Sequence, residues 1–251
     1  MQRLVGPPII RCEAMTDDVL QNEPYEVALR WLKELEGRIR RLRDDQRVWE
    51  KLQAMIAANP ALHRPSDFYR WLQDMYVAGM AMAIRRLVDE HDKAVSFVRF
   101  LRLVKENPNI VSRARYRRLF EQDRHGQFEV LQELGEFDNY VDAFYDDLVA
   151  PGVDAPDPRD VNTEITTLKK VTKRLAVFAT KVIAHADEPK PTNLPKFVEV
   201  GIAIEKFEEL LKRYVALTRA ATISVGSVAQ YDPEAIFRVP WIPPKTKQEG
   251  R

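Results

Sequence analysis

Prolines divide this sequence into long segments, and within those segments apolar residues recur at the spacing of an α-helix. Many of the sixteen prolines are grouped, at Pro7-Pro8, Pro151 to Pro158, Pro189 to Pro195 and Pro240 to Pro244. Because proline disrupts the interior of a helix, these groups predict where helices end. Only nine glycines occur. The sequence therefore predicts an all-α fold, a helical bundle built from long amphipathic helices.

The apolar pattern predicts helices over residues 24–59, 66–87, 92–106, 110–122, 160–186 and 194–224. The first is either one long helix or two helices joined near Asp44-Asp45. Ser66 is the expected N-cap of the second helix. Asn162 or Thr163 is the expected N-cap of the fifth, with Glu164 in its first turn, where a carboxylate favours the positive end of the helix dipole. Residues 127–148 are mixed and are expected to be helical in part.

The length of 251 residues favours one large helical domain. We expect that domain, a helical bundle, to cover residues 24–230. A flexible N-terminal arm is expected over residues 1–23 and a proline-bearing C-terminal tail over residues 231–251. The tail contains Phe237 and Trp241, and large aromatic side chains in a tail usually dock onto the body of the protein or onto a partner.

Charge and cysteine content restrict the setting in which the chain works. A formal net charge of +1 provides no global field that would attract nucleic acid or an anionic membrane, so such binding needs a local patch. Cys12 is the only cysteine, which excludes an intramolecular disulfide and favours a cytoplasmic location. The longest apolar run, Tyr76 to Ile84, falls short of the roughly 20 residues that span a bilayer, so no membrane segment is expected.

Motifs that would define a metal site or a cofactor site are missing from the sequence. It has no phosphate-binding glycine-rich loop, no paired metal-ligand cysteines and no H-E-x-x-H motif. The four histidines are far apart along the chain, at His63, His91, His125 and His185. We therefore expect neither a metal nor a cofactor.

The segment from Lys169 to Asp187 stands out because it carries five cations and no acid before Asp187. On an ideal helix one face collects Lys170, Arg174, Phe178, Lys181 and His185. A basic stripe that its own helix does not neutralise can follow a phosphate backbone, so the candidate RNA-binding residues are Lys170, Lys173 and Arg174. A histidine can hold or release a proton near neutral pH, which makes His185, with Lys181, the candidate catalytic pair. The alternative is that this face is simply solvated.

Two further groups of charged residues have simpler interpretations. A second basic cluster, formed by Arg113, Arg115, Arg117 and Arg118, is interpreted as a solvated face, with RNA contact as the alternative. Arg86 and Asp89, three residues apart, are interpreted as an ion pair within one helix.

The region around His185 resembles a known family motif. Phe178-Ala-Thr-Lys181-Val-Ile-Ala184-His185-Ala-Asp187 is similar to the motif segment of the HEPN superfamily, in particular its abortive-infection AbiU-like branch, which reads roughly F-R-N-K-x-x-A-H-x-D. Residues 80–91 resemble the family's helix with R-L-x-D, with Arg86 and Asp89 at those positions. The polar loop and long helix after His185, and the closing segment Ile236-Phe-Arg-Val-Pro-Trp241, also resemble this branch. The likeness extends from about Pro24 to Trp241.

The resemblance implies a helical bundle that commonly forms a homodimer and brings two motif helices together. Active members are metal-independent endoribonucleases in which the motif arginine and histidine promote attack of the ribose 2′-hydroxyl on the adjacent phosphate. This sequence departs from that pattern at the arginine position, which is Ala179, and at the next position, which is Thr180. Loss of one preorganised charge stabiliser costs on the order of a hundred- to a thousandfold in rate. Lys181 supplies a charge nearby but lacks the bidentate geometry of a guanidinium.

Three functions follow as hypotheses. The first is a degenerate HEPN protein that binds RNA or a partner within a phage-defence or toxin–antitoxin system, where the partner is an antitoxin or a nucleotidyltransferase. The second is a working metal-independent endoribonuclease that uses Lys181 and His185. The third is a structural helical dimer with no role in RNA binding.

Overall fold

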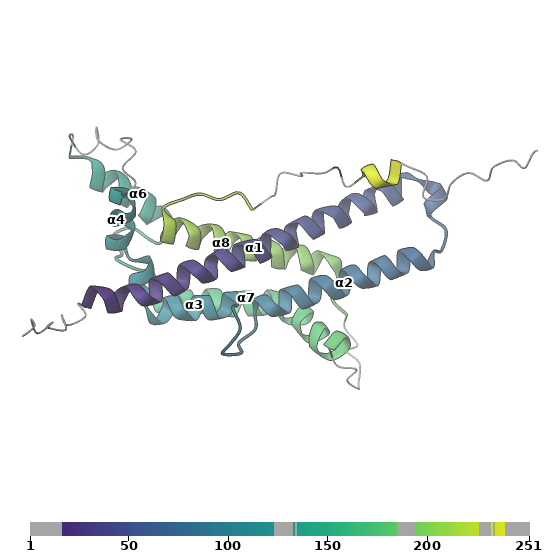
Figure 1. The fold of residues 1–251 in the computed structure, drawn as a ribbon, viewed down its shortest axis with the longest axis horizontal. Coiled ribbons are helices and arrows are strands. Elements are labelled where there is room, and N and C mark those ends of the chain that lie inside the picture. The colour runs from purple at the N-terminus through teal and green to yellow at the C-terminus, as the bar shows by residue number, and fades with distance from the viewer. Residues whose placement is uncertain are drawn as a thin grey trace, which may run out of the picture.

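The computed structural model describes the backbone of residues 17–122, 133, 135–184, 194–225, 232 and 234–238, and the side chains of these residues except 17–22 and 122. Over these ranges the chain is helical and contains no β-strand, which confirms the predicted all-α bundle. The longest helix is α1 (Asp17–Ala58). A short 3-10 turn, η1 (Pro60–Leu62), leads into α2 (Asp67–Leu87), which runs back beside α1 (Figure 1).

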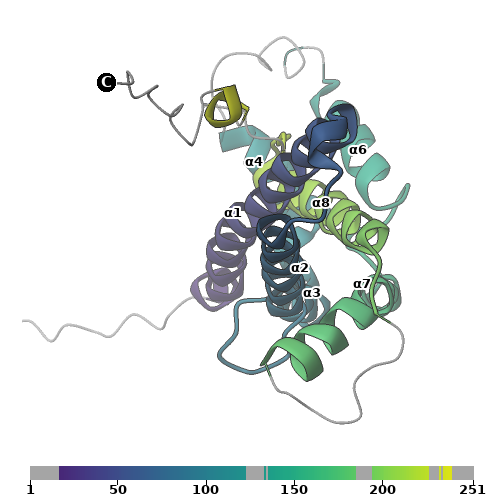
Figure 2. The same cartoon turned by 90° about the vertical axis from the view of Figure 1, so that its right-hand side faces the viewer.

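Three further helices complete the bundle: α3 (Phe97–Glu106), α7 (Pro158–Phe178) and α8 (Phe197–Arg219). The helix α8 packs along α1, and α7 packs against α2, α3 and α8. Viewed along the bundle, α7 and α8 lie on one side of the hairpin formed by α1 and α2 (Figure 2). Residues more than a hundred positions apart in the sequence therefore share one interior.

The core follows from the apolar stripes of these helices. On α1, Leu32, Leu35, Ile39 and Leu42 are buried at spacings of three and four, as a helix with one face against a core requires. Aromatic rings from α3 and α8, among them Phe100 and Tyr214, belong to the same core cluster. Phe100 meets Tyr214 edge to face with 5.3 Å between ring centroids, a preferred geometry for aromatic pairs.

Buried polar groups tie α8 to its neighbours. The hydroxyl of Tyr214 donates to a carboxylate oxygen of Glu164 at 2.6 Å, and Arg213 forms an ion pair with the same carboxylate. Burial, and then the negative charge of Glu164, raise the pKa of Tyr214 above its ordinary value. One turn further along α8, Tyr25 of α1 donates to the backbone carbonyl of Thr218 at 2.7 Å. These bonds satisfy polar groups that would otherwise be costly to bury.

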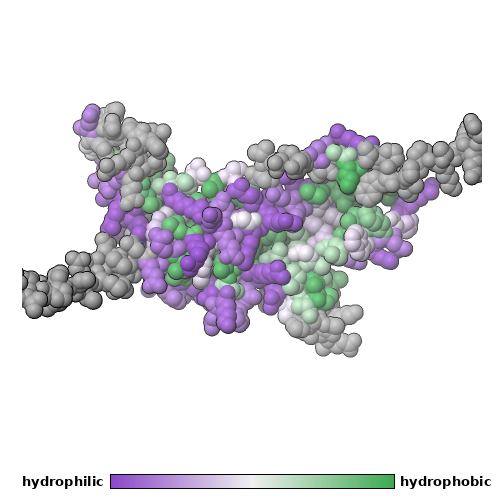
Figure 3. Space-filling model, viewed as in Figure 1, coloured by the Kyte–Doolittle hydropathy of each residue, from purple (hydrophilic) through white to green (hydrophobic). Residues whose placement is uncertain are grey.

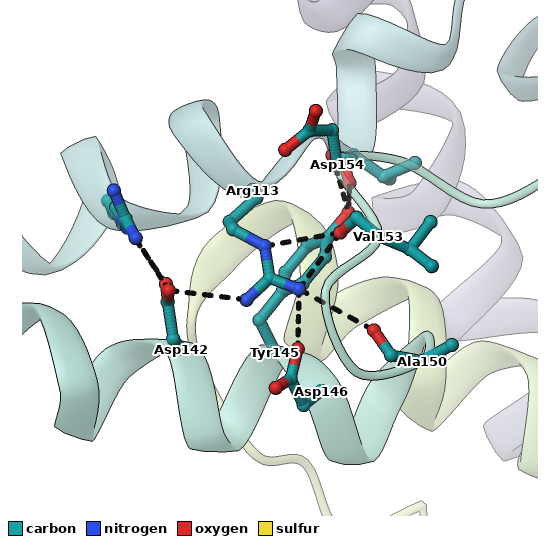
Figure 4. Close-up of polar contacts among 9 residues, drawn as sticks. Arg113, Asp142, Tyr145, Asp146, Ala150, Val153 and Asp154 are labelled. Carbon is teal, nitrogen blue, oxygen red and sulfur yellow. Dashed lines mark hydrogen bonds and ion pairs between the residues drawn. The ribbon is translucent and has the colours of Figure 1, made fainter.

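A smaller pair of helices, α4 (Arg113–Gln122) and α6 (Phe137–Leu148), packs at one end of the bundle. Arg113 is buried there and donates to the carbonyl of Val153 and to Asp146, with Asp142 at 3.4 Å (Figure 4). Arg117 makes a bidentate ion pair with Asp142, in which Nε donates to Oδ1 at 2.8 Å and Nη2 donates to Oδ2 at 2.5 Å. The interpretation of this cluster as a solvated face is wrong for Arg113 and Arg117, because acids from α6 neutralise them.

Several helix boundaries differ from those predicted. The helix α1 is continuous through Asp44-Asp45 and begins before Pro24, so residues 17–23 are helical and not part of an arm. Its first residues, Asp17 and Asp18, are acids of the kind that stabilise the positive end of a helix dipole. Ser66 caps α2 as predicted and accepts from the Tyr69 amide at 3.4 Å.

Two other predicted helix starts were wrong. The N-cap of α7 is Asp157, not Asn162 or Thr163, so Glu164 lies beyond the first turn and serves the core instead. The helix α3 begins at Phe97, capped by Ser96, and residues 108–111 form a 3-10 turn, η2 (Pro108–Val111), ahead of α4. Pro158 in the first turn of α7 and Ser96 immediately before Phe97 set these boundaries.

The described part of the tail contacts the body. A 3-10 turn, η4 (Ala235–Arg238), lies near the junction of α1 and α2, where Glu234 is 3.5 Å from Lys51 and Phe237 faces Leu52, Met55 and Leu72. This confirms the predicted docking for Phe237, whereas Trp241 lies outside the described residues. Among the helices that the structure describes, none combines the length and the apolar character that crossing a membrane requires.

Candidate functional site

The helix α7 changes character at the segment that resembles the family motif. After Phe178 the α-helix gives way to a π-helical stretch, η3 (Ala179–Ala184), where a continuous α-helix to Ala186 was predicted. π-helical turns are rare and occur frequently at functional sites. The hydroxyl of Thr180 donates back to the carbonyl of Ala176 at 3.0 Å, at the point where the helix widens. Such back-bonding from threonine often bends a helix.

Ala179, at the position of the motif arginine, is fully buried where η3 packs against α2. A guanidinium from another helix contacts the neighbouring residue, Thr180. Arg85 of α2 donates from Nε to the hydroxyl oxygen of Thr180 at 2.8 Å and lies 3.7 Å from Asp89. Asp89 is thus paired with Arg85, and the predicted ion pair with Arg86 is not the one that forms.

Arg85 is the residue of this region that sequence reasoning missed. The helical pattern of α2 contained a signal for it. Ala81 is buried and lies one turn before Arg85 on the same side of the helix, whereas Arg86 falls on the exposed side. The family pattern directed attention to Arg86 instead.

The predicted basic stripe divides into paired and open cations. Arg174 forms an ion pair with Glu199 at the start of α8 and also donates to the carbonyl of Leu194. Lys169 pairs with Glu90, and the hydrogen bond from Lys169 holds the pKa of Glu90 below its ordinary value. Acids on other elements therefore neutralise part of the stripe, although its own helix contains none.

Three lysines of the segment that begins at Lys169, two of them in the stripe, remain open to solvent. Lys170, Lys173 and Lys181 are exposed, and no ion pair is recorded for them within the described ranges. They extend from the middle of α7 into η3, roughly 16 Å along the helix axis at 1.5 Å per residue. The three lysines are called the open lysines below. His185, the predicted catalytic partner of Lys181, lies outside the described residues, so the spacing of that pair stays a prediction.

An apolar groove adjoins this basic surface. Its volume is about 380 Å³, and the side chains that form it include Tyr76, Val77, Leu175, Phe178, Ile183 and Phe197. Burial raises the pKa of Tyr76 to about 12. Lys196 lies at the groove as well, so the apolar trough has positive charge nearby. In the part of the chain that the structure describes, no group of three or more His, Cys, Asp or Glu side chains is arranged to hold a metal ion.

Fold and site together define a helical bundle in which a π-helical turn ends a partly neutralised basic helix. Comparisons with protein families, with curated proteins and with solved structures found no match for this chain. The likeness to the HEPN superfamily therefore rests on the motifs quoted above.

Proposed function

We propose that this chain is a cytoplasmic, HEPN AbiU-like protein that binds RNA within a phage-defence or toxin–antitoxin system, and that its ribonuclease motif is too depleted for strong cleavage. The observation that carries the proposal is the pairing of two features in one helix. The open lysines form an exposed basic surface, and Ala179 occupies a buried position where the family has its arginine.

The electrostatic part of the proposal depends on the open lysines. Three cations along about 16 Å can each meet a phosphate of a single strand, and each such contact releases a counterion. Of the predicted RNA-binding residues, Arg174 is expected to contribute least to RNA affinity, because Glu199 already neutralises its charge. We therefore assign RNA contact mainly to Lys170 and Lys173, with Lys181 at the end of the stripe.

The catalytic part follows from position 179. A charged side chain that starts from a fully buried backbone position would have to be desolvated, which is unfavourable unless it is paired. Arg85 does not replace it directly, since Thr180 and Asp89 already engage its guanidinium. Without the arginine we expect a rate lower by about a hundred- to a thousandfold than that of an intact site.

The proposed assembly is a homodimer. At the start of α8, Leu194, Val198 and Ile202 are exposed although they are apolar, and Val198 is 63% accessible. This surface adjoins the Arg174–Glu199 ion pair, so a symmetric contact through it would bring two stripes close together. A monomeric mass at micromolar concentration would contradict the dimer. The proposed setting also implies an antitoxin or a nucleotidyltransferase as partner, which co-purification from the native host would test.

The experiment that tests the proposal measures binding and cleavage together. Labelled single-stranded RNA is incubated in EDTA with the wild-type protein and with His185→Ala, over a series of salt concentrations. We expect binding that weakens steeply with salt, and no cleavage. Cleavage that ends in a cyclic phosphate and is lost in His185→Ala would favour an active endoribonuclease. Absence of both signals would contradict the proposal and leave a structural role.

A further inference from the structure

The hairpin formed by α1 and α2 carries an exposed apolar surface formed by residues of those two helices. Val48 of α1 is 49% accessible, and Trp71 and Met75 of α2 are 55% and 56% accessible. With Phe68 these α2 residues form a ridge at spacings of three and four. Figure 3 shows apolar surface at this end of the molecule, beside η4. Exposed apolar patches of this kind usually mark a contact surface.

The surface is hollowed into a groove with two compartments. The outer compartment, of about 440 Å³, lies between the end of α1 and the start of α2 and is formed by Met55, Ile56, Phe68 and Tyr69, among others. The inner compartment, of about 360 Å³, contains Val48, Met75, Gly79 and, at its far end, Asp45. Leu52 and Leu72 line both compartments, so the two form one continuous trough.

The outer compartment already contains part of the chain. Phe237 of η4 lies against it, and the ion pair between Lys51 and Glu234 holds that turn on α1. The amide of Glu234 donates to Asp232 at 2.9 Å, which fixes the start of the turn. The tail is thus held at the outer compartment, which adjoins the inner compartment at Leu52 and Leu72.

The residues that follow have the composition and reach to fill it. After Arg238 the sequence reads Val239-Pro-Trp241-Ile-Pro-Pro244, which is apolar and, because of its prolines, favours an extended backbone. Four extended residues span up to about 13 Å. One helical turn of α1, from Leu52 to Val48, advances only about 6 Å. Trp241 can therefore reach the inner compartment from the position of Phe237.

The inner compartment suits this occupant in shape and charge. A Cβ atom at Gly79 would meet nothing within 4 Å, so the groove is open above this residue. Asp45 at its far end lies 3.6 Å from Arg41 but its side chain remains 48% exposed, and Lys245 follows the last proline of the tail segment. Since the segment is tethered at η4, its effective concentration is in the millimolar range, and a modest apolar contact is enough to hold it.

We propose that Val239 to Pro244 occupies the inner compartment, with Trp241 packed between Val48 and Met75 over Gly79. The tail then forms a strap that joins α1 to α2 and covers the apolar surface that the described residues leave exposed. This inference does not depend on RNA binding.

Thiol labelling at Gly79 tests the strap. In a Cys12→Ser background, Gly79→Cys is compared in the full chain, in the Trp241→Ala variant and in a chain that ends at Arg238. We expect the full chain to react with a maleimide roughly tenfold more slowly than the other two, because an occupied groove must open first. Arg70→Cys, on the outward face of α2, is the control and should react equally in all three.

Equal labelling rates at Gly79→Cys in the full and shortened chains would overturn the proposal. Protection that disappears on dilution would also overturn it, because the occupant would then be a second copy of the chain. Circular dichroism of each variant establishes that the bundle is intact, and a chain ending at Pro244 should keep the full protection.

Discussion

Two basic clusters of this protein look alike in the sequence and differ in the structure in how far acids from other elements neutralise them. Arg113 and Arg117 on α4 face Asp142 and Asp146 of α6, and the guanidinium of Arg113 is buried among backbone carbonyls. The open lysines on α7 and η3 face solvent. A run of cations becomes a binding surface only where no acid arrives from elsewhere in the fold, and the sequence around the run does not contain that information.

The largest difference between the clusters should appear in stability. Arg113→Ala removes a buried partner from two carboxylates and from the carbonyl of Val153, so we expect a loss of about 3–5 kcal/mol in the free energy of unfolding. Arg118→Ala, on the exposed side of the same helix, should change it by less than about 0.5 kcal/mol. Urea unfolding measures both. A loss below about 1 kcal/mol for Arg113→Ala would place that cluster on the surface after all.

Restoring the family arginine tests the depleted motif. Ala179→Arg buries a charge and adds volume in a packed position, so we expect destabilisation of about 2–4 kcal/mol and no gain in RNA cleavage. The matched control is Ala184→Arg, at an exposed position of the same π-helical segment, which should be nearly neutral. A stable Ala179→Arg protein that cleaves RNA in EDTA would show that the position can present an arginine to substrate.

The pH dependence of stability should come in part from the α4–α6 cluster. The hydrogen bond from Arg117, and the charges of Arg117 and Arg113, hold the pKa of Asp142 below its ordinary value of about 4. Because the folded-state pKa is the lower one, this contribution is complete above pH 4 and is lost as the pH falls through the folded value.

Asp142→Asn should therefore cost about 1–3 kcal/mol at pH 7 and flatten the decline in stability between pH 4 and pH 2, measured by urea unfolding at each pH. An acid profile identical to wild type would exclude Asp142 as a source of the decline. Lys170→Ala, outside the cluster, serves as the control whose profile should stay that of the wild type.

The smallest predicted effect concerns the π-helical turn. Thr180→Val keeps the shape of the side chain but removes the hydrogen bonds to Arg85 and Ala176, so we expect a loss of about 1 kcal/mol. A double-mutant cycle with Arg85→Ala should give a coupling of about 0.5 kcal/mol or more. A coupling near zero would mean that Arg85 does not fix this turn. Arg86→Ala is the control for the neighbouring exposed position.

Much of the fold could be predicted from the sequence because its helices are amphipathic and end at prolines. Ser66 as a cap, the end of the first helix just before Pro60 and the all-α class all follow from local chemistry. The start of α7 was placed too late, because Asn162 and Thr163 both suit an N-cap, whereas Asp157, just ahead of Pro158, caps the helix. Local rules locate an element well and its first residue poorly.

The site was predicted less completely, and the reason is tertiary. The change from α-helix to π-helix at Ala179 coincides with the contact between Thr180 and Arg85, which are far apart in the chain. The neutralisation of Arg174 by Glu199 likewise depends on where α8 begins. Helical spacing placed Lys170 and Lys181 on one face, but which cations stay open was decided by acids on neighbouring helices.

The open lysines as the RNA-binding surface are the central claim, and the salt dependence of RNA affinity tests it most directly. The slope of log affinity against log salt is negative, and each lost phosphate contact reduces its magnitude by about 0.7 for a single strand. Lys170→Ala combined with Lys173→Ala should therefore reduce the magnitude of the slope by about 1.4. The matched control combines Lys33→Ala and Lys212→Ala, at exposed positions of α1 and α8, and should leave the slope unchanged. The same slope in both double variants would contradict the assignment.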